Sequence, residues 1–230
     1  MNEISHIWKL NFTNNNIVDI SVLANFKKLI SIYLSNNKIK TLAVFSEDEN
    51  FPFLRRLEMA GNKISDLPAI KCPKLEHIDL TDNKIDKHDT WVGHPNLKVF
   101  KLGENKLKSL AAFAALPSLE ILDVSNNNIG AFGGFSGLDK LEVLNLEGNK
   151  LDKIEEEIPE LPSIKEINLT GTKITNIENL KFIFKYETLQ RLFINDTPLE
   201  NNASSFNFLL SEIMIVFPRL KEYCGVEITD

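Results

Sequence analysis

Residues 141–151 read L-E-V-L-N-L-E-G-N-K-L, and the spacing L-x-x-L-x-L-x-x-N-x-L in this stretch occurs nine times along the chain. The ninth position holds Asn in seven copies and Thr in two, and we call these residues the ladder residues. They are Asn15, Asn37, Asn62, Asn83, Asn105, Asn127, Asn149, Thr172 and Thr197. A period this short and regular predicts a solenoid, in which each copy stacks only on its neighbours.

The composition is that of an ordinary soluble protein with an acidic balance. The 230 residues include 32 Asp and Glu against 26 Lys and Arg, which gives a net charge of −6. Nucleic-acid binding needs concentrated positive charge, so we expect no nucleic-acid partner. We also expect no membrane association, because no stretch approaches the roughly 18 apolar residues that span a bilayer.

The compartment is expected to be the cytoplasm. The N-terminus lacks the basic and apolar regions of a secretion signal. Cys72 and Cys224 lie far apart in a stack where only neighbouring copies touch, so they are not expected to form a disulfide. A chain without cysteine-bearing end caps fits a reducing compartment.

Each copy predicts a short strand followed by an outer segment. Leu144 and Leu146 alternate with Val143 and Asn145, so the leucines point inward and the other two residues point away from the core. Each buried ladder residue is expected to bond backbone groups of its own and the adjacent turn. In the outer segments, such as residues 107–116, the apolar spacing of about three predicts 3₁₀ or short α-helical turns, with phenylalanines packed in a buried row.

The expected organisation is one domain, residues 1–230, with nine repeats over about 7–200 and a C-terminal cap over about 201–230. A helix is predicted from Ser204 to Val216, because Phe206, Leu209, Leu210 and Ile213 recur at helical spacing. Such a helix would cover the apolar end of the stack. It is apolar on more than one face, so it could also be a docking surface.

No arrangement of residues indicates catalysis. The chain has four histidines, no phosphate-binding glycine loop and no nucleophile or zinc motif. The best candidate group, His77 with Asp79 and Asp123, would lie on an open, wet sheet, where a reaction lacks a water-excluded pocket. We therefore expect no enzyme activity, metal, cofactor or small-molecule substrate.

The candidate partner-binding surface is the face of the sheet that points away from the core. The residues predicted to line it are Tyr33, Arg56, Glu58, His77, Asp79, Val99, Lys101, Ile121, Asp123, Val143, Asn145 and Phe193. Among them Val99, Ile121 and Val143 form a continuous apolar strip, which we call the aliphatic strip, beside charged residues. Such a strip is typical of a protein-recognition surface, although β-branched residues also simply suit strands and shield one another.

A second candidate is the residue after the ladder position, which is lysine in six copies. This lysine ridge consists of Lys38, Lys63, Lys84, Lys106, Lys150 and Lys173. It could attract an acidic segment, or its members could be ordinary solvated turn residues. Binding through the ridge would weaken steeply with salt, and binding through the aliphatic strip would not.

The repeat resembles the short, intracellular class of leucine-rich-repeat proteins. The resemblance rests on the 22-residue period, the N-K-I and N-K-L turns at 37–39 and 149–151, and the cap around residues 217–220. It implies an α/β leucine-rich-repeat solenoid, a curved right-handed β/α superhelix with a parallel sheet on the concave face, short or 3₁₀ helices on the convex face and a C-terminal helical cap. The turn at 196–198 and the charged ending at 226–230 look most like axonemal, radial-spoke-associated members.

Two functions follow as hypotheses from this resemblance. The first is a non-catalytic scaffold or adaptor in a larger assembly, with the ciliary axoneme and cytoskeleton as its setting. The alternative is a regulatory subunit that targets an enzyme such as protein phosphatase 1. In that family the contacts on the concave face are aromatic and acidic, and Tyr33, Glu58, Asp79 and Asp123 could supply them.

Overall fold

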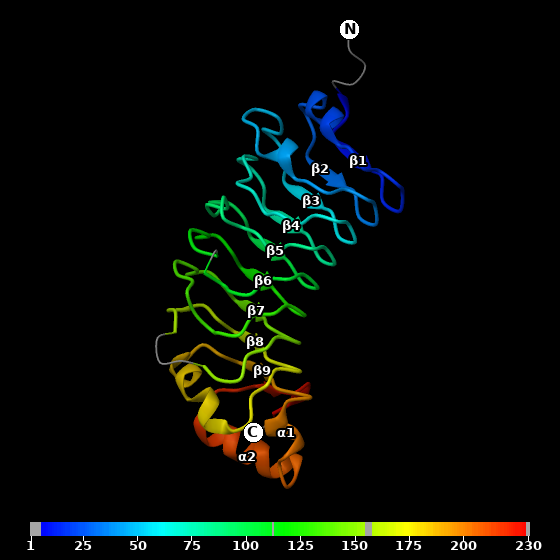
Figure 1. The fold of residues 1–230 in the computed structure, drawn as a ribbon. Coiled ribbons are helices and arrows are strands. Elements are labelled where there is room, and N and C mark those ends of the chain that lie inside the picture. The colour runs from blue at the N-terminus through cyan, green and yellow to red at the C-terminus, as the bar shows by residue number, and fades with distance from the viewer. Residues whose placement is uncertain (1–5, 112, 155–157, 229–230) are drawn as a thin grey trace.

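The protein is a stack of turns with a parallel sheet running along one side (Figure 1). The computed structural model describes residues 6–111, 113–154 and 158–228. The repeat strands are β1 (Lys9–Asn11), β2 (Ser31–Tyr33), β3 (Arg56–Glu58), β4 (His77–Asp79), β5 (Val99–Lys101), β6 (Ile121–Asp123), β7 (Val143–Asn145), β8 (Glu166–Asn168) and β9 (Arg191–Phe193). This architecture confirms the predicted leucine-rich-repeat solenoid.

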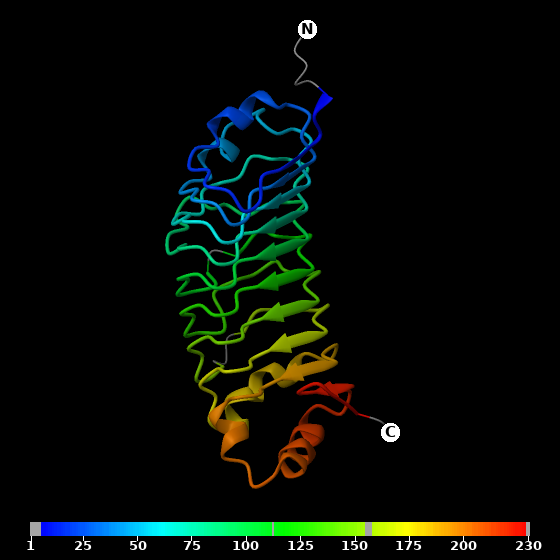
Figure 2. The same ribbon diagram turned by 90° about the vertical axis from the view of Figure 1, so that its right-hand side faces the viewer.

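The strands pair in parallel and in register, and Figure 2 shows them lying side by side. From β2 to β9 the central residue of each strand is buried, whereas its two neighbours are half-buried. Consecutive strands place equivalent residues opposite one another, as in Leu122 beside Leu144. The alternation read from the sequence therefore gives the observed register.

The ladder residues close the turns that follow the strands, and Asn105 shows how. Its side-chain Nδ2 donates to the carbonyls of Leu102 and Gly103 in its own turn, at 3.0 Å each. The same Nδ2 donates to the carbonyl of Leu80 in the preceding turn, also at 3.0 Å. Its Oδ1 accepts the backbone N–H of Ile85 at 2.9 Å, so one amide joins two repeats.

The same four contacts recur at six ladder positions, as predicted from the sequence. These are Asn37, Asn62, Asn83, Asn105, Asn127 and Asn149. Asn15 is exposed, and within the described residues its side chain bonds only carbonyls of its own turn, although its backbone N–H donates to the Asn36 carbonyl at 3.2 Å. Thr172 and Thr197 are buried, but within the described residues each hydroxyl donates only to its own turn, at 2.6 and 2.7 Å.

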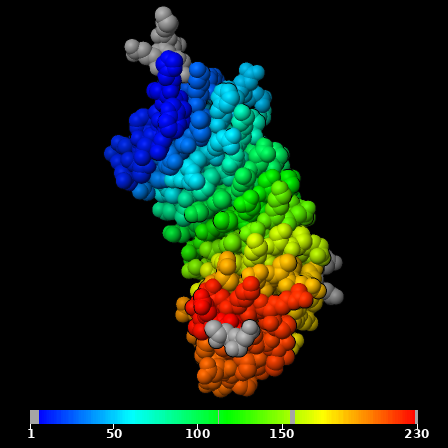
Figure 3. Space-filling view, turned by 180° about the vertical axis from the view of Figure 1, so that it is seen from behind, coloured from blue at the N-terminus to red at the C-terminus, as the bar shows by residue number. Residues whose placement is uncertain are grey.

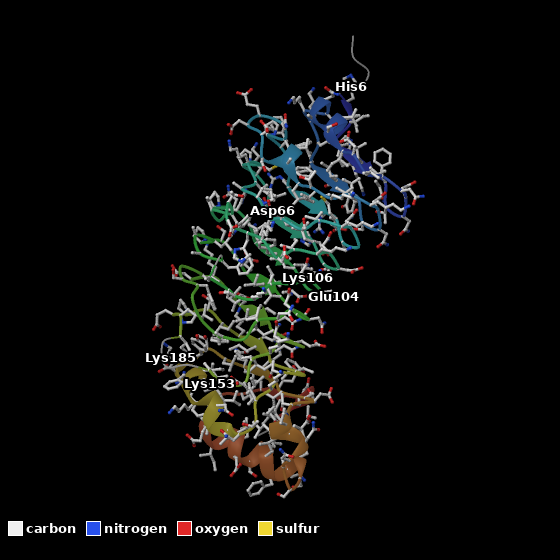
Figure 4. The ribbon with its side chains drawn as sticks, viewed as in Figure 1. His6, Asp66, Glu104, Lys106, Lys153 and Lys185 are labelled. Atoms are coloured by element: carbon white, nitrogen blue, oxygen red, sulfur yellow. The ribbon has the colours of Figure 1, made fainter. Side chains whose placement is uncertain are left out.

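The residue before each ladder residue adopts a left-handed backbone conformation, which the sequence reasoning did not anticipate. The φ angles run from 50° to 66° at Asn14, Asn36, Gly61, Asp82, Glu104, Asn126, Gly148, Gly171 and Asp196. Gly, Asn and Asp tolerate this region best, and eight of the nine positions hold one of them. Glu104 is the exception, and Figure 4 places it beside Lys106 at the edge formed by the turns.

The outer segments are less regular than the sequence suggests. Helical turns form at η2 (Ser21–Asn25), η3 (Ala43–Phe45) and η4 (Ile177–Lys185). In η4 Asn176 and Asn179 cap each other's backbone N–H groups, which stabilises the start of the helix. The described outer segments between η3 and η4 contain no helix. Their prolines and glycines disfavour helical turns there.

The outer side still buries its aromatic residues, as predicted. Phe113 and Phe132 are fully buried, and the ring centroids of Phe100 and Phe113 lie 5.9 Å apart in an edge-to-face contact. Trp91 occupies a core position, with its ring 5.3 Å from that of Phe100. These contacts make one continuous core along the stack.

The C-terminal end contains the predicted helix and an unpredicted pair of strands. The helix α2 (Phe206–Val216) follows the short helix α1 (Pro198–Asn201), and its N-cap Ser205 accepts the N–H of Phe208. Strand β10 (Glu222–Tyr223) extends the parallel sheet beyond β9, and β11 (Val226–Glu227) pairs with it in antiparallel fashion. Figure 3 shows the C-terminal residues gathered at one end of an elongated body.

Candidate protein-binding surface

The sheet presents two rows of side chains on the surface that we call the sheet face. The first residue of each strand forms one row: Lys9, Ser31, Arg56, His77, Val99, Ile121, Val143, Glu166 and Arg191. The third residue forms the other row: Asn11, Tyr33, Glu58, Asp79, Lys101, Asp123, Asn145, Asn168 and Phe193. All twelve predicted site residues therefore lie on one surface.

The N-terminal third of the sheet face is held by polar contacts among its own side chains. The Lys9 ammonium lies 5.0 Å from the centroid of the Tyr33 ring. Arg56 Nη1 contacts Glu58 Oε1 at 2.7 Å, and His77 Nε2 lies 3.9 Å from the same oxygen. Arg56 and Glu58 thus satisfy one another, which leaves them less free to meet a partner.

His77 is neutral at physiological pH. Burial lowers the pKa of its imidazole, the Arg56 guanidinium lowers it further, and the carboxylates of Glu58 and Asp79 oppose that shift. Its contact with Glu58 is therefore not an ion pair near pH 7.

The middle of the sheet face carries the aliphatic strip. Val99 pairs with Ile121 and Ile121 pairs with Val143, so the three branched side chains lie on adjacent strands, roughly 4.8 Å apart. Each of the three is half-buried, which leaves part of each side chain in water. The strip is continuous over three repeats.

Charges of alternating sign lie beside the aliphatic strip. Asp79, Lys101 and Asp123 follow one another in register on β4, β5 and β6. One carboxylate oxygen of each aspartate accepts a backbone N–H two residues later, at 3.0 Å. Within the described residues these aspartates form no ion pair with Lys101, so all three charges can interact with a partner.

In the C-terminal third of the sheet face, polar side chains again bond to groups of the protein itself. Arg191 Nε contacts Glu166 Oε2 at 2.7 Å, and Asn168 Nδ2 donates to Glu147 Oε2 at 3.2 Å. Asn145 Oδ1 accepts the N–H of Glu147. Phe193 is half-buried at the end of its row.

The sequence reasoning missed an apolar group at the edge where the chain enters each strand. Trp8 and Ile30 immediately precede β1 and β2, and Phe53 lies nearby; all three are exposed. The sequence contains a signal for this apolar group, because the residue before the strand is apolar in the first two repeats and polar in every later one. The polar residues at this position are Arg55, Glu76, Lys98, Glu120, Glu142, Lys165 and Gln190.

The lysine ridge lies along the opposite edge. All six ridge lysines are exposed, and in the described part of the chain none of their side chains forms an ion pair or hydrogen bond. Their backbone N–H groups bond to the preceding repeat, as Lys106 does to Ile85 at 3.0 Å. The turn position thus has a structural role that does not depend on the lysine side chain.

The two cysteines do not form a disulfide, and one of them is buried. Cys72 and Cys224 are free thiols, and burial raises the pKa of Cys72 to about 12. Across residues 6–228, apart from the undescribed positions, no group of three or more His, Cys, Asp and Glu is placed to hold a metal ion. None of the helices in the described residues is both long and apolar enough to cross a bilayer.

Comparison with known families identifies the repeat. A "Leucine rich repeat" profile matches residues 73–129, a "Leucine Rich repeats (2 copies)" profile matches residues 52–89, and a third, "Leucine Rich Repeat", matches residues 140–161. No curated protein sequence matches the chain significantly.

Solved structures share the fold at low sequence identity. The leucine-rich-repeat domain of APL1B superposes with a TM-score of 0.70 and 21% identity, over 93% of this chain and 62% of that one. Internalin C2 from Listeria monocytogenes superposes with a TM-score of 0.62 and 22% identity, over 87% of this chain and 79% of that one. A chain of the LRIM1/APL1C complex superposes with a TM-score of 0.67 and 22% identity, over 83% of this chain and 35% of that one. The chain thus spans about a third of that relative, and these likenesses show the fold alone.

Proposed function

Because this chain is a leucine-rich-repeat protein with a period of about 22 residues, we propose that it is a non-catalytic scaffold that binds another protein on the sheet face. Leucine-rich-repeat domains typically serve protein–protein interaction, and solenoids present extended surfaces for it. The proposal places the centre of binding at the aliphatic strip.

The in-register strip of Val99, Ile121 and Val143 carries this proposal. Three partly exposed branched side chains on neighbouring strands offer apolar area to a partner. To either side, the sheet face is occupied by residues that already bond one another. An apolar centre with a polar surround is the usual anatomy of a protein interface.

The row of Asp79, Lys101 and Asp123 supports the proposal by giving the site specificity. Its alternating charges would select a partner with the opposite pattern, because like charges placed together across an interface are unfavourable. The backbone bonds of the two aspartates hold their carboxylates in place before binding. A preorganised site loses less conformational entropy on binding.

The test compares Ile121→Asp with Val92→Asp in affinity capture from the source cells. Val92 is 72% exposed on the outer side, so its substitution adds the same charge away from the sheet face. Proteins identified by mass spectrometry with the wild type and with Val92→Asp should disappear with Ile121→Asp. Binding of the purified partner should also survive high salt. Equal capture by all three chains would refute a sheet-face site.

A finer proposal is that the scaffold is an adaptor in an assembly of the ciliary axoneme. It rests on the resemblance at residues 196–198 and in the cap. Support also comes from α2, where Phe208 and Ile215 are 53% and 81% exposed and offer a second apolar contact. Capture of cytoskeletal proteins would support this setting, whereas capture of a soluble phosphatase without them would contradict it.

The alternative is a regulatory subunit for an enzyme such as protein phosphatase 1. Tyr33, Glu58 and Asp79 lie in register in one row of the sheet face, and Asp123 lies two strands beyond Asp79. This gives the aromatic and acidic character that the alternative needs. The triple variant Glu58→Gln, Asp79→Asn and Asp123→Asn should lose association with the enzyme. Retained association would exclude this alternative.

A further inference from the structure

A hollow of about 490 Å³ lies on the edge of the first three repeats, apart from the sheet face. We call it the N-terminal edge hollow. It is lined by His6, Trp8, Lys28, Ile30, Phe53, Arg55 and Lys74. Residues of three consecutive repeats therefore meet there.

The apolar side chains of the hollow are exposed to an unusual degree. The exposed fractions are 61% for Trp8, 45% for Phe53 and 38% for Ile30. Ile30 precedes β2, which has a neighbouring strand on each side, so its exposure does not come from the end of the stack. The position faces sideways, and the apolar group there is a lateral surface feature.

The charged side chains that line the hollow, among the described residues, are all basic. None of the described carboxylates lines it, although acidic residues outnumber basic ones in the chain, 32 to 26. The Lys74 ammonium lies 4.8 Å from the centroid of the Phe53 ring, and Arg55 pairs with Glu76 at the margin. Within the described residues Lys28 and Lys74 have no carboxylate partner, so their charge is available to a ligand.

We propose that the N-terminal edge hollow binds a short acidic segment of a partner protein. An apolar side chain of that segment would pack on Trp8, Ile30 and Phe53, and flanking carboxylates would meet Lys28 and Lys74. Apolar contact supplies the attraction, and charge complementarity selects an acidic sequence. This site is separate from the sheet face, so it stands or falls independently of the function proposed above.

The geometry favours a peptide over a bilayer or a nucleic acid. A hollow accepts a projecting side chain, whereas a flat lipid surface would meet only its rim. A nucleic acid needs a track of cations, but beyond the hollow the same edge alternates Glu76, Glu120 and Glu142 with Lys98 and Lys165. Lys98 is paired with Glu76 and Lys165 with Glu142, so this edge offers no continuous track of free cations to a phosphate backbone.

The test measures binding of a fluorescein-labelled peptide of sequence Glu-Leu-Glu-Phe-Glu-Leu-Glu-Glu by fluorescence anisotropy. The peptide should bind the whole chain saturably, and its affinity should fall as salt increases. A matched peptide with Gln in place of each Glu should bind at least about tenfold more weakly. Trp8 provides a second readout, because the other tryptophan, Trp91, is buried and the emission of Trp8 should change on binding.

Two charge-reversal variants locate the site. Lys28→Glu with Lys74→Glu should weaken peptide binding by about tenfold or more. Lys63→Glu with Lys84→Glu makes the same change in net charge on the lysine ridge and should leave affinity within about twofold; circular dichroism confirms that both variants fold. Ile121→Asp should have no effect on this peptide.

Several outcomes would overturn the proposal. They are absence of binding, equal loss in the two double variants, equal binding of the Glu and Gln peptides, and tighter binding of a ten-residue oligothymidylate or of phosphatidylserine vesicles than of the peptide. The last two results would assign the hollow to nucleic acid or to membrane.

Discussion

At the scale of single residues, the buried ladder amides should contribute more to stability than any surface residue of the turns. Asn105→Ala should lower the free energy of unfolding by about 1–3 kcal/mol, because it removes four hydrogen bonds and leaves the buried backbone N–H of Ile85 without its acceptor within the described residues. Asn15→Ala, at an exposed turn, should change it by less than about 0.5 kcal/mol. Urea unfolding of both variants measures the difference, and equal losses would contradict a structural ladder.

His94 should make stability depend on pH. It is 3% exposed, its Nε2 lies 2.9 Å from the Cys72 carbonyl and its Nδ1 accepts the N–H of Asn96. Both contacts fit the neutral ring with its proton on Nε2, and burial lowers the pKa of His94 although the bond to Cys72 opposes that shift.

The sign follows from linkage. The unfolded chain binds a proton at His94 near the usual pKa of 6.5, and the folded chain binds it only at lower pH. Stability should therefore fall as pH drops below about 6.5. His94→Gln, which can still donate to Cys72, should flatten the dependence between about pH 7.5 and 5.5, and His77→Gln should flatten a smaller part because His77 is more exposed. Urea unfolding midpoints at several pH values in this range measure the pH dependence of stability. If His94→Gln showed the same pH dependence as the wild type, His94 would not be its source.

The residue scale also shows what the sequence could and could not predict. The ladder bonds were predictable because the same amide recurs at one place in each copy. The left-handed position before it was not anticipated, because its residues have different side chains: Gly, Asn and Asp share only a tolerance of positive φ, and Glu104 lacks even that. His94 stands where other repeats have Phe51, Leu116 or Leu138, and nothing in its type alone indicates burial.

At the scale of elements, strands were more predictable than outer segments. The strand alternation is local and its register is fixed by the stacking of identical leucine positions. Outer segments vary in length and composition, so whether a helix forms depends on caps such as those of η4. Strands β10 and β11 were missed because their connection, Cys224-Gly225, is a two-residue turn with both φ angles positive, 50° and 82°. Two-residue turns of this kind are usually recognised in a sequence by Asn-Gly or Asp-Gly, and this one has Cys at the first position.

The cap helix α2 should stabilise the end of the stack through one face only. Ile213 is fully buried, so Ile213→Ala should lower the free energy of unfolding by about 2–5 kcal/mol. Ile215 lies on the same helix but is 81% exposed, and Ile215→Ala should change stability by less than about 0.5 kcal/mol. Thermal and urea unfolding of this matched pair separate the two faces. A comparable loss in both variants would mean that α2 packs differently.

At the scale of the whole molecule, the candidate surfaces differ in how far the sequence could reveal them. The sheet face follows from a period of two repeated nine times, so its rows could be read from the register. The N-terminal edge hollow depends on side chains from three repeats that meet outside the strands. Trp8 lies in the first repeat, and only its position beside Ile30 and Phe53 shows a lateral surface.

The stack should transmit the effect of a substitution to its neighbours and no further. Asn105 and Asn127 both donate to the carbonyl of Leu102, at 3.0 Å each. In Asn105→Ala this carbonyl keeps one partner, whereas the double variant with Asn127→Ala leaves it with neither amide. The double variant should therefore lower the free energy of unfolding by more than the sum of the two single effects, with an excess of about 0.5 kcal/mol or more.

Asn37 and Asn149 provide the matched control for this coupling. They share no hydrogen-bond partner and lie at opposite ends of the row of six bridging asparagines. In a solenoid each repeat contacts only adjacent repeats, so their losses should add to within about 0.5 kcal/mol. The free energies of unfolding of the four single and two double variants, measured in urea, give the coupling energy of each pair by a double-mutant cycle. Equal coupling in the near and far pairs would show that stability is shared along the entire chain, contrary to nearest-neighbour stacking.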